Sequence, residues 1–295
     1  MASGQERILR RRIRSINSTK KITRAMELIA ASRIVRAQAR VHAAAPYADQ
    51  ITQVVQDLAG AGGVSDSPLL VPRPEIRKVA HVVIAADRGL CGAYNSSIFR
   101  AAEGSIREHR ELGQDYELVV VGRKTESYFR YRNYRVMAAL TGFSDQPSYE
   151  DARAIAHAVE GPFLSGEVDK VQLIYTRFAS AGFQEVVIRP LMPLDPETFQ
   201  AHEREGPAPD YEFEPSASEI LDRLLPRYAE ARVYAALLNA AASEHAARQR
   251  AMKSATDNAE DLITSLTRTM NRARQDAITT EIMEVVGGAE ALGNR

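Results

Sequence analysis

Apolar residues at both ends of the chain follow a heptad pattern. Starting at Leu9 and stepping alternately by four and three residues to Leu58, twelve of fifteen positions are apolar. This spacing is typical of a coiled-coil seam. Residues 5–45 contain neither glycine nor proline, so Pro46 is the only expected kink. The pattern predicts an N-terminal helix that is roughly 80 Å long over residues 4–58.

Polar residues interrupt this seam at three consecutive positions. They are Lys20, Thr23 and Glu27. Around them the apolar stripe moves to a different face of the helix, at Ile22, Met26 and Ile29. We interpret the shift as a change of packing partner along the helix.

The C-terminal end repeats the pattern. From Leu221 to Ala277, fourteen of seventeen seam positions are apolar, and alanine dominates them. The small side chains let two helices approach closely, and glycine is absent from 207 to 286. The pattern predicts a helix of roughly 110 Å over 217–290, with Pro226 bending its first turns. Since the two arms share a seam type, we expect them to form an antiparallel pair.

Beyond the seam, the apolar stripe of the C-terminal arm is displaced by one residue. The displaced positions are Ile278, Ile282, Val285, Ala289 and Leu292. A displaced stripe faces a partner other than the N-terminal helix. The end of the chain is therefore predicted to be an apolar tip that contacts another protein.

The middle of the chain alternates short β-rich runs with helical ones. Strands are predicted at Val79–Ala85, Glu117–Val121, Tyr134–Ala138, Lys170–Phe178 and Glu185–Arg189, and helices near 95–112, 123–132 and 147–162. This alternation indicates a Rossmann-like α/β domain with a mostly parallel sheet covered on both faces. The predicted fold is thus a long antiparallel two-helix coiled coil with an inserted α/β domain. Its segments are a helix at 1–60, a linker at 61–75, the α/β domain at 76–198, a linker loop at 199–216 and a helix at 217–295.

Charge is distributed unevenly although the formal net charge is zero. Residues 1–40 hold eleven Lys/Arg and two Asp/Glu, whereas the middle of the chain is acidic. A basic cluster of this kind suits nucleic acid, an anionic membrane surface or acidic partner subunits. No nucleic-acid reader fold or stacking aromatic accompanies it. We expect no secretory signal and no bilayer-spanning segment, and one cysteine allows no internal disulfide.

The loop DRGLCGAYN at 87–95 follows a predicted strand and precedes a helix, which is where α/β proteins often bind ligands. It has neither dinucleotide nor P-loop spacing. Cys91 there would be a nucleophile if its pKa were lowered. A phosphate-binding cysteine loop would need an arginine six residues later, where Ser97 stands, so a tight turn with a buried thiol is favoured. The six histidines lack metal-ligand spacing, and we predict no catalytic residue, cofactor or metal.

Three blocks carry a family resemblance. The stretches RIRSINSTKKITRAMELIAASRIVRAQ, DRGLCGAYN and AMKSATDNAEDLITSLTRTMNRARQDAITTEIMEVVGGAEAL resemble gamma subunits of F-type ATP synthases. The last block fits the family pattern I-T-x-E-x-x-E-x-x-x-G-A-x-A at Ile278, Thr279, Glu281, Glu284, Gly288, Ala289 and Ala291. The resemblance covers essentially the whole chain. The segment 202–214 lacks the regulatory cysteine pair of plastid relatives.

The resemblance implies a non-catalytic role. In that family the end helices form the rotating central shaft inside a ring of three alpha and three beta subunits. The α/β domain is the foot that binds epsilon and the c-ring. The shaft couples proton flow to ATP synthesis or hydrolysis on the beta subunits. For this chain we expect the same partners, no nucleic acid, and a peripheral place on the cytoplasmic side of a bacterial cell membrane, reached through the complex.

The resemblance also implies contact residues. Arg274 and Gln275 match shaft residues that hydrogen-bond to a beta-subunit loop, and Met26 lies where the shaft passes the moving lever of beta. The basic collar, with Arg10, Lys20 and Lys21, would face acidic loops of the ring. The apolar tip would turn in a sleeve. Two other classes stay open: an enzyme with a site at the α/β sheet, and a coiled-coil adaptor for membranes or nucleic acid.

Overall fold

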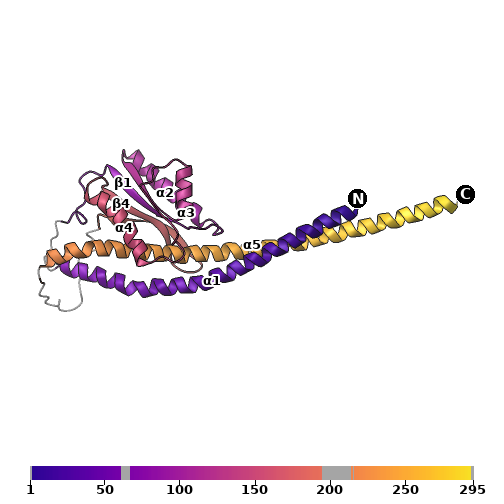
Figure 1. Cartoon of the computed structure of the whole chain (residues 1–295), viewed down its shortest axis with the longest axis horizontal. Helices are drawn as coiled ribbons and strands as arrows, with labels where there is room; N and C mark the ends of the chain where they lie inside the picture. Colours follow the sequence, from indigo (N-terminus) through magenta and orange to yellow (C-terminus); the bar gives the residue numbers. More distant parts are fainter. Residues whose placement is uncertain (1, 61–66, 195–213, 215, 294–295) are drawn as a thin grey trace. The chain divides into compact units, whose positions relative to one another are not determined.

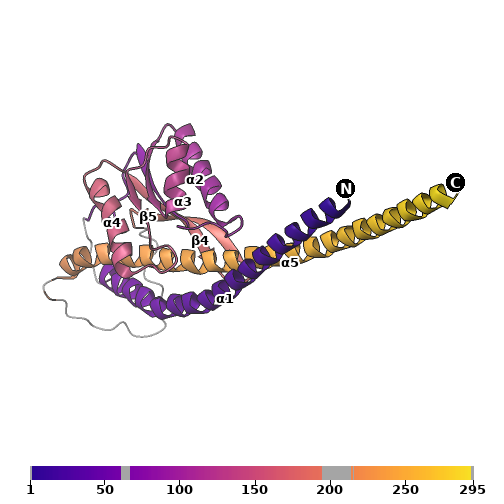
Figure 2. The same ribbon diagram turned by 45° about the vertical axis from the view of Figure 1, so that its right-hand side comes forward.

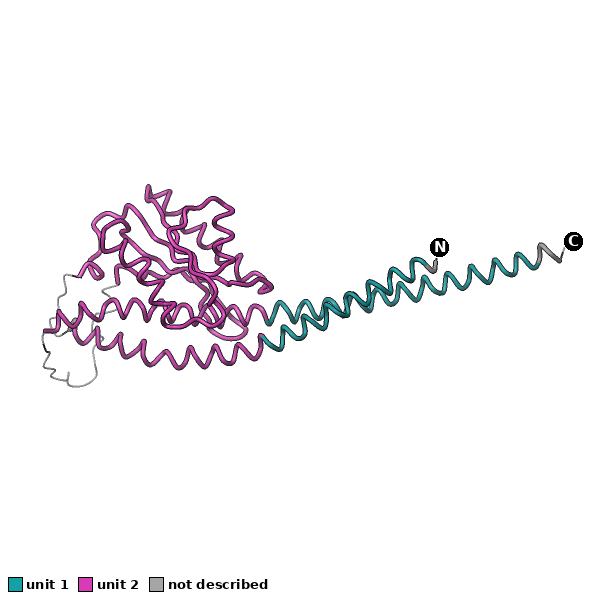
Figure 3. The backbone as a smooth tube through the Cα atoms, in the orientation of Figure 1, with its two compact units in different colours: residues 1–29, 249–295 teal, residues 30–248 magenta. Residues whose placement is uncertain are grey.

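The computed structural model describes residues 2–60, 67–194, 214 and 216–293. The predicted linker 61–75 lies partly, and the predicted linker loop 199–216 almost wholly, outside these residues. The chain divides into two compact units (Figure 3). Unit 1 consists of residues 1–29 and 249–295, and unit 2 of residues 30–248. Within the described ranges, no helix carries an apolar stretch long enough to cross a bilayer.

Two long helices contribute to both units. They are α1, Ala2–Gly60, and α5, Ala217–Gly293. Both pass through a proline, Pro46 in α1 and Pro226 in α5. Every predicted seam position between Leu9 and Leu58 is buried or half-buried, as is every seam position of α5 from Leu221 to Ala277. The heptad prediction is therefore confirmed along both helices.

The two helices run antiparallel within each unit. In unit 1, Lys20 pairs with Glu260, and the later residue Thr23 bonds to the earlier residue Thr256. In unit 2, the sequence colouring shows α1 and α5 side by side with opposite chain directions (Figures 1 and 2), and the Arg40 guanidinium lies 3.4 Å from the Tyr234 hydroxyl. Residue numbers thus rise along α1 as they fall along α5, which confirms the predicted antiparallel pairing.

The inserted domain belongs to unit 2 and holds a five-stranded sheet (Figure 1). Its elements are β1 Lys78–Ile84, α2 Tyr94–Glu111, β2 Asp115–Val121, α3 Arg123–Tyr131, β3 Ala138–Leu140, α4 Tyr149–Leu164, β4 Lys170–Phe178 and β5 Gln184–Met192. The strand order is β3-β2-β1-β4-β5. The first four strands are parallel, and β5 is antiparallel to β4. The sheet is mixed because this edge strand follows its neighbour through a short hairpin.

One predicted strand is misplaced. The sequence predicted Tyr134–Ala138, but β3 covers Ala138–Leu140. Asn133 has a left-handed backbone with φ of 58°, so the chain turns just before the predicted strand. Tyr134 then packs edge-on against Phe129, 5.2 Å between ring centres. The β-branched and aromatic residues of 134–137 are used for packing, and pairing with β2 begins only at residue 138.

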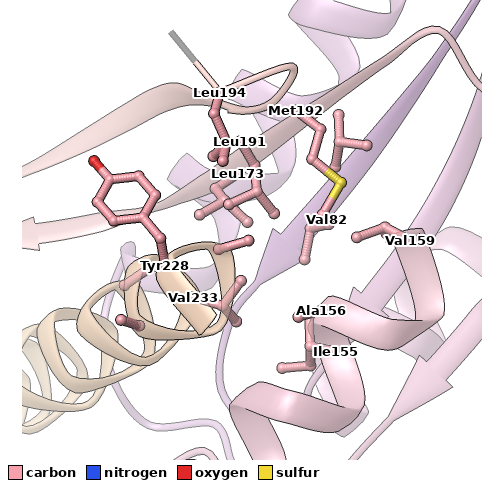
Figure 4. Close-up of a cluster of buried hydrophobic side chains, with 14 of the residues drawn as sticks. Val82, Ile155, Ala156, Val159, Leu173, Leu191, Met192, Leu194, Tyr228 and Val233 are labelled. Carbon is pink, nitrogen blue, oxygen red and sulfur yellow. The ribbon is translucent and has the colours of Figure 1, made fainter. Parts of the chain in front are cut away.

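Both faces of the sheet are covered by helices (Figures 1 and 2). On one face, α2 and α3 bury Ile98, Phe99 and Phe129 against β1 and β2. On the other, α4 packs with the unit 2 portions of α1 and α5. Figure 4 shows this second core, in which Ile155 and Val159 of α4 face Val82. The strands are apolar on both sides because both faces are buried, as expected for parallel strands.

Local signals fix the ends of the elements around the sheet. Ser148 caps α4, because its side chain accepts a hydrogen bond from the Asp151 amide and the Asp151 carboxylate accepts one from the Ser148 amide. This is the reciprocal capping box. Gly122 ends β2 with φ of 95°, and a Cβ there would lie 2.3 Å from the Ala85 carbonyl oxygen. Only glycine fits this position.

Candidate contact surfaces of the long helices

The three polar seam residues of α1 form a polar layer in unit 1, and two of them, Lys20 and Thr23, bond to α5. The hydroxyls of Thr23 and Thr256 are 2.8 Å apart and buried. The Lys20 ammonium lies 3.1 Å from a Glu260 carboxylate oxygen. Glu27 is 7% exposed and accepts two hydrogen bonds of 2.9 Å from Arg24. The seam therefore continues through these positions, with polar pairs in place of apolar ones.

The apolar stripe beside this layer points away from α5. Ile22 is 60% exposed and Ile29 is 54% exposed, while Met26 is half-buried. Leu28, which the sequence reasoning missed, is 57% exposed beside them. The sequence contained a signal for Leu28, because it is an apolar residue outside the seam, on an otherwise polar face of the helix. Packing against α5 does not account for an apolar residue there. Exposed apolar side chains grouped in this way indicate a surface that a partner covers.

The C-terminal end of α5 exposes a second apolar surface. Ile278, Ile282 and Val285 are 46%, 56% and 72% exposed. Met283 and Val286 add to this surface and were not predicted. The Leu292 side chain lies outside what the structure describes. The stripe displaced from the seam is thus solvent-facing at each described large position.

Polar candidates on unit 1 are mostly exposed. Arg274 and Gln275 are both exposed on α5. Arg10 is exposed and donates to Glu6 at 2.6 Å, while Lys21 is exposed. Such positions suit contacts across an interface, where arginine binds carboxylates in a bidentate way. Lys20 differs from them because its ammonium is already paired with Glu260.

The other candidate, the loop 87–95, lies at the carboxyl end of β1. The strand order reverses between β1 and β4, and ligands of open α/β sheets bind at such a reversal. Here α5 occupies that edge. The Tyr94 hydroxyl donates to the Ala240 carbonyl at 3.1 Å, the Ser243 hydroxyl donates to the Thr176 carbonyl at 3.1 Å, and the Asn239 side chain accepts from the Phe178 amide at 3.2 Å.

A buried polar network fastens the same loop to α5. Glu244 is 1% exposed and accepts hydrogen bonds from Arg248 at 2.7 Å and from the Ser144 hydroxyl at 3.0 Å. Burial raises the pKa of Glu244, and Arg248 and Ser144 oppose that rise. Arg248 also lies within 3.3 Å of the Gly89 carbonyl.

Asp87 completes the network from the loop side. Its carboxylate accepts backbone N–H groups of Arg123, Gly142 and Ser144 at 2.9 to 3.0 Å. Burial alone would raise the pKa of Asp87, but these hydrogen bonds outweigh burial and lower it. The loop is therefore held rigidly by groups that bond to one another.

Cys91 behaves as a structural thiol. It is 2% exposed, and burial raises its pKa, with Glu244 adding to the rise and Arg248 opposing it. A raised pKa is the opposite of what a nucleophilic thiol needs. The tight turn with a buried thiol is thus the interpretation that the structure supports. Across the ranges that the structure describes, no three His, Cys, Asp or Glu residues gather as metal ligands.

Comparisons with known proteins agree over the full length. The family model described as ATP synthase matches residues 5–292. The ATP synthase gamma chain of Frankia casuarinae is 53% identical and covers 99% of each chain. That of Mycobacterium tuberculosis is 50% identical over 97% of each chain.

Solved structures show the same fold. A chain of the Tetrahymena thermophila mitochondrial ATP synthase central stalk and c-ring is 25% identical, with a TM-score of 0.60 over 79% of this chain and 99% of that one. A chain of the Euglena gracilis mitochondrial ATP synthase, in a structure with OSCP, F1 and the c-ring, has a TM-score of 0.66 at 15% identity. It covers 98% of this chain and 95% of that one.

Proposed function

Since the chain belongs to the ATP synthase gamma-chain family, we propose that it is the central rotor shaft of an F-type ATP synthase. It couples proton flow through the membrane ring to ATP synthesis or hydrolysis on the alpha–beta hexamer. It also regulates the ATPase activity and the proton flow. Catalysis takes place on the beta subunits, so this chain is a non-catalytic subunit. The occupied edge of its sheet agrees with that role, because α5 stands where a small-molecule ligand would bind.

The exposed apolar surfaces of unit 1 carry the proposal. Large apolar side chains on α1 and α5 there are half-exposed or more, at Ile22, Leu28, Ile29, Ile282 and Val285. A two-helix coiled coil needs only its seam to hold together. Apolar side chains off the seam lower the free energy only when another surface covers them. A sleeve of alpha and beta subunits around the shaft is such a surface.

The two parts of the chain are assigned to different partners. The helices of residues 1–60 and 217–295 form the shaft inside the ring of three alpha and three beta subunits. The α/β domain, residues 76–198, forms the foot that contacts epsilon and the c-ring. The Tetrahymena relative, solved with a central stalk and a c-ring, supports this assignment. The segments 61–75 and 199–216 connect shaft and foot.

We also propose the individual contacts that the family resemblance implies, and exposure and chemistry support them. Arg274 and Gln275 donate hydrogen bonds to a beta-subunit loop, and the exposure of both side chains on α5 supports this. Met26 packs against the moving lever of beta. Arg10, Lys20 and Lys21 form the basic collar that faces acidic loops, and Lys20 also contacts Glu260.

Rotation changes catalysis through these contacts. The two helices present different side chains at each angle, so the shaft favours a different conformation of each beta subunit. A shaft that binds one conformation more tightly shifts the nucleotide affinity of that site. No chemistry on this chain is required.

The complex containing this chain is membrane-associated. We place it on the cytoplasmic face of a bacterial cell membrane, with this chain attached peripherally through the complex. The bacterial origin of the relatives that are 50% and 53% identical supports that location.

Reconstitution with alpha and beta subunits tests the proposal. The parent chain should form a stable complex with fast, cooperative ATP hydrolysis. Replacing Arg274 and Gln275 together by alanine should slow hydrolysis at least tenfold, because both donors to beta are lost. The matched control is Arg272→Ala, an exposed arginine one helical half-turn earlier, which should change the rate by less than about twofold.

Two results would count against the rotor. In one, the parent chain neither joins alpha and beta nor changes their rate of hydrolysis. In the other, the Arg272 control is as slow as the double variant, which would assign the effect to the charge of the helix end rather than to specific donors.

A further inference from the structure

The sheet of unit 2 ends in a long edge strand, β5. Within the described residues β5 pairs only with β4, and the register of this pair is unbroken from Gln184 to Pro190. The outer backbone N–H and C=O groups of residues 185–189 therefore have no strand partner in that part of the chain. An unpaired row of this kind is a template for another strand.

The edge carries little that would keep another strand away. Proteins guard such edges with lysine, proline or a bulge. In β5, Pro190 and a shift of register lie at one end, and residues 184–189 contain neither lysine, proline nor glycine. Ile188 is 41% exposed, and the two valines before it are half-buried. The stretch 185–189 is therefore open to pairing along its whole length.

The side chains of this stretch are arranged so that the strand is complementary to itself. Glu185, Val187 and Arg189 lie on one face, because side chains alternate along a strand. In an antiparallel pair of two copies centred on Val187, Glu185 of each copy stands opposite Arg189 of the other. On the other face, Val186 then stands opposite Ile188. Moving the centre by one residue in either direction places both charged residues opposite uncharged ones.

Both charged side chains are accessible for such a pair. The Glu185 side chain is 49% exposed and lies 3.0 Å from Arg177 on the neighbouring strand β4. Arg189 is exposed. In the paired arrangement the Glu185 carboxylate lies between Arg177 of its own copy and Arg189 of the second copy. Its two oxygens can accept from both guanidinium groups.

We propose that two copies of the free chain pair antiparallel through β5, with a two-fold axis at Val187. The two five-stranded sheets then join into one, and both copies contribute the same residues. Cross-strand pairs of opposite charge and of β-branched residues stabilise such a strand pair. The proposed rotor uses a single copy, so this pairing belongs to the chain before assembly and goes beyond the rotor function.

Sedimentation equilibrium of the full chain at a series of micromolar concentrations tests the pairing. The parent should show a monomer–dimer equilibrium. The variants Glu185→Arg and Arg189→Glu each place like charges opposite one another, so each should weaken the dimer at least tenfold. An equimolar mixture of these two variants should dimerise as tightly as the parent, because both cross-strand pairs then again join opposite charges.

The matched control is Arg153→Glu, which reverses an exposed charge on α4. Its dimer should be as tight as that of the parent, and unfolding midpoints check that all three variants are folded. A parent chain that stays monomeric at every concentration would overturn the proposal. So would a mixture of the two β5 variants that stays monomeric, since the parent dimer would then form through another surface. Neither result bears on assembly with alpha and beta subunits, which tests the rotor function separately.

Discussion

The two units of this chain differ in how far their apolar and charged side chains are buried. Unit 2 covers both faces of its sheet and buries charged groups such as Glu244 and Arg248 in mutual hydrogen bonds. Among the residues that the structure describes, unit 1 leaves ten large apolar side chains exposed on two helices. Unit 2 exposes the same number over nearly three times as many residues. The exposed apolar side chains are therefore concentrated on unit 1, whose surface is suited to a partner.

Salt bridges within unit 2 show what burial itself does, because α5 carries both a buried and an exposed i,i+4 pair there. Glu244 and Arg248 are buried, at 2% and 11% side-chain exposure, and lie 2.7 Å apart. Glu219 and Arg223 have the same i,i+4 spacing and the same distance, but are 48% and 76% exposed. Burial is the main difference between them, so it should decide the energetic result.

The largest expected effect is that of Glu244→Ala. The substitution leaves the guanidinium of Arg248 buried without a counter-charge, which costs about 3–5 kcal/mol of unfolding free energy. Glu219→Ala removes the carboxylate of the solvent-exposed pair and should cost less than about 1 kcal/mol of unfolding free energy. Urea unfolding of both variants measures this. Equal losses would mean that the network around Glu244 does not stabilise unit 2.

Acid should destabilise unit 2 through a second buried group. His81 is fully buried on β1, and neither ring nitrogen has a hydrogen-bond partner within the described part of the chain. Burial lowers its pKa to about 3, with His109 on α2 and Lys170 on β4 adding to the effect. The unfolded chain therefore takes up this proton near pH 6.5 and the folded chain does not. Stability is present above pH 6.5 and is lost as the pH falls toward 3.

The variant His81→Leu isolates that contribution. Between pH 7 and pH 5 the parent should lose about 2 kcal/mol more unfolding free energy than the variant. The variant should also be at least as stable at pH 7, since it removes two unsatisfied polar atoms. Unfolding curves at the two pH values provide the test. If the parent and the variant lost the same unfolding free energy between pH 7 and pH 5, His81 would be protonated in the folded state.

Periodicity predicted the long helices well, because burial follows spacing directly. All seam positions are buried or half-buried, including Lys20, Thr23 and Glu27. The same method misplaced β3, because β-branched and aromatic residues at 134–137 pack in a turn instead of pairing. It also could not predict the link between Glu244, Ser144 and Asp87, because Ser144 lies 100 positions from Glu244 and 57 from Asp87 in the sequence. Only the folded chain brings such groups together.

A smaller effect is expected for the polar layer of unit 1. One of the Thr23 and Thr256 hydroxyls donates to the other at 2.8 Å, and a carbonyl of each one's own helix also lies within hydrogen-bond distance, at 3.1 Å for Thr23 and 2.9 Å for Thr256. In each single valine variant the remaining hydroxyl can still donate to the carbonyl of its own helix. A double-mutant cycle of Thr23→Val and Thr256→Val should give a coupling free energy of about 1 kcal/mol. A coupling near zero would show that the pair does not hold the register of the two helices.

The smallest effect on the free chain is that of Ile282→Ser. Ile282 is 56% exposed on α5, and serine and isoleucine have similar helix propensities. The unfolding free energy should change by less than about 0.5 kcal/mol. A seam substitution of similar size, Leu266→Ser, should cost more because Leu266 is half-buried. If Ile282→Ser were the more damaging of the two, the side chain would be packed within the chain rather than available to a partner.

Thiol labelling at position 282 tests most directly whether a partner covers the exposed face of unit 1. A maleimide should modify Ile282→Cys quickly in the free chain, whereas Cys91 is buried with a raised pKa and reacts slowly. After assembly with alpha and beta subunits, labelling at 282 should slow at least tenfold. Ser127→Cys, exposed on α3 of unit 2, should label at the same rate before and after. Unchanged labelling at 282 in an assembled complex would contradict the account.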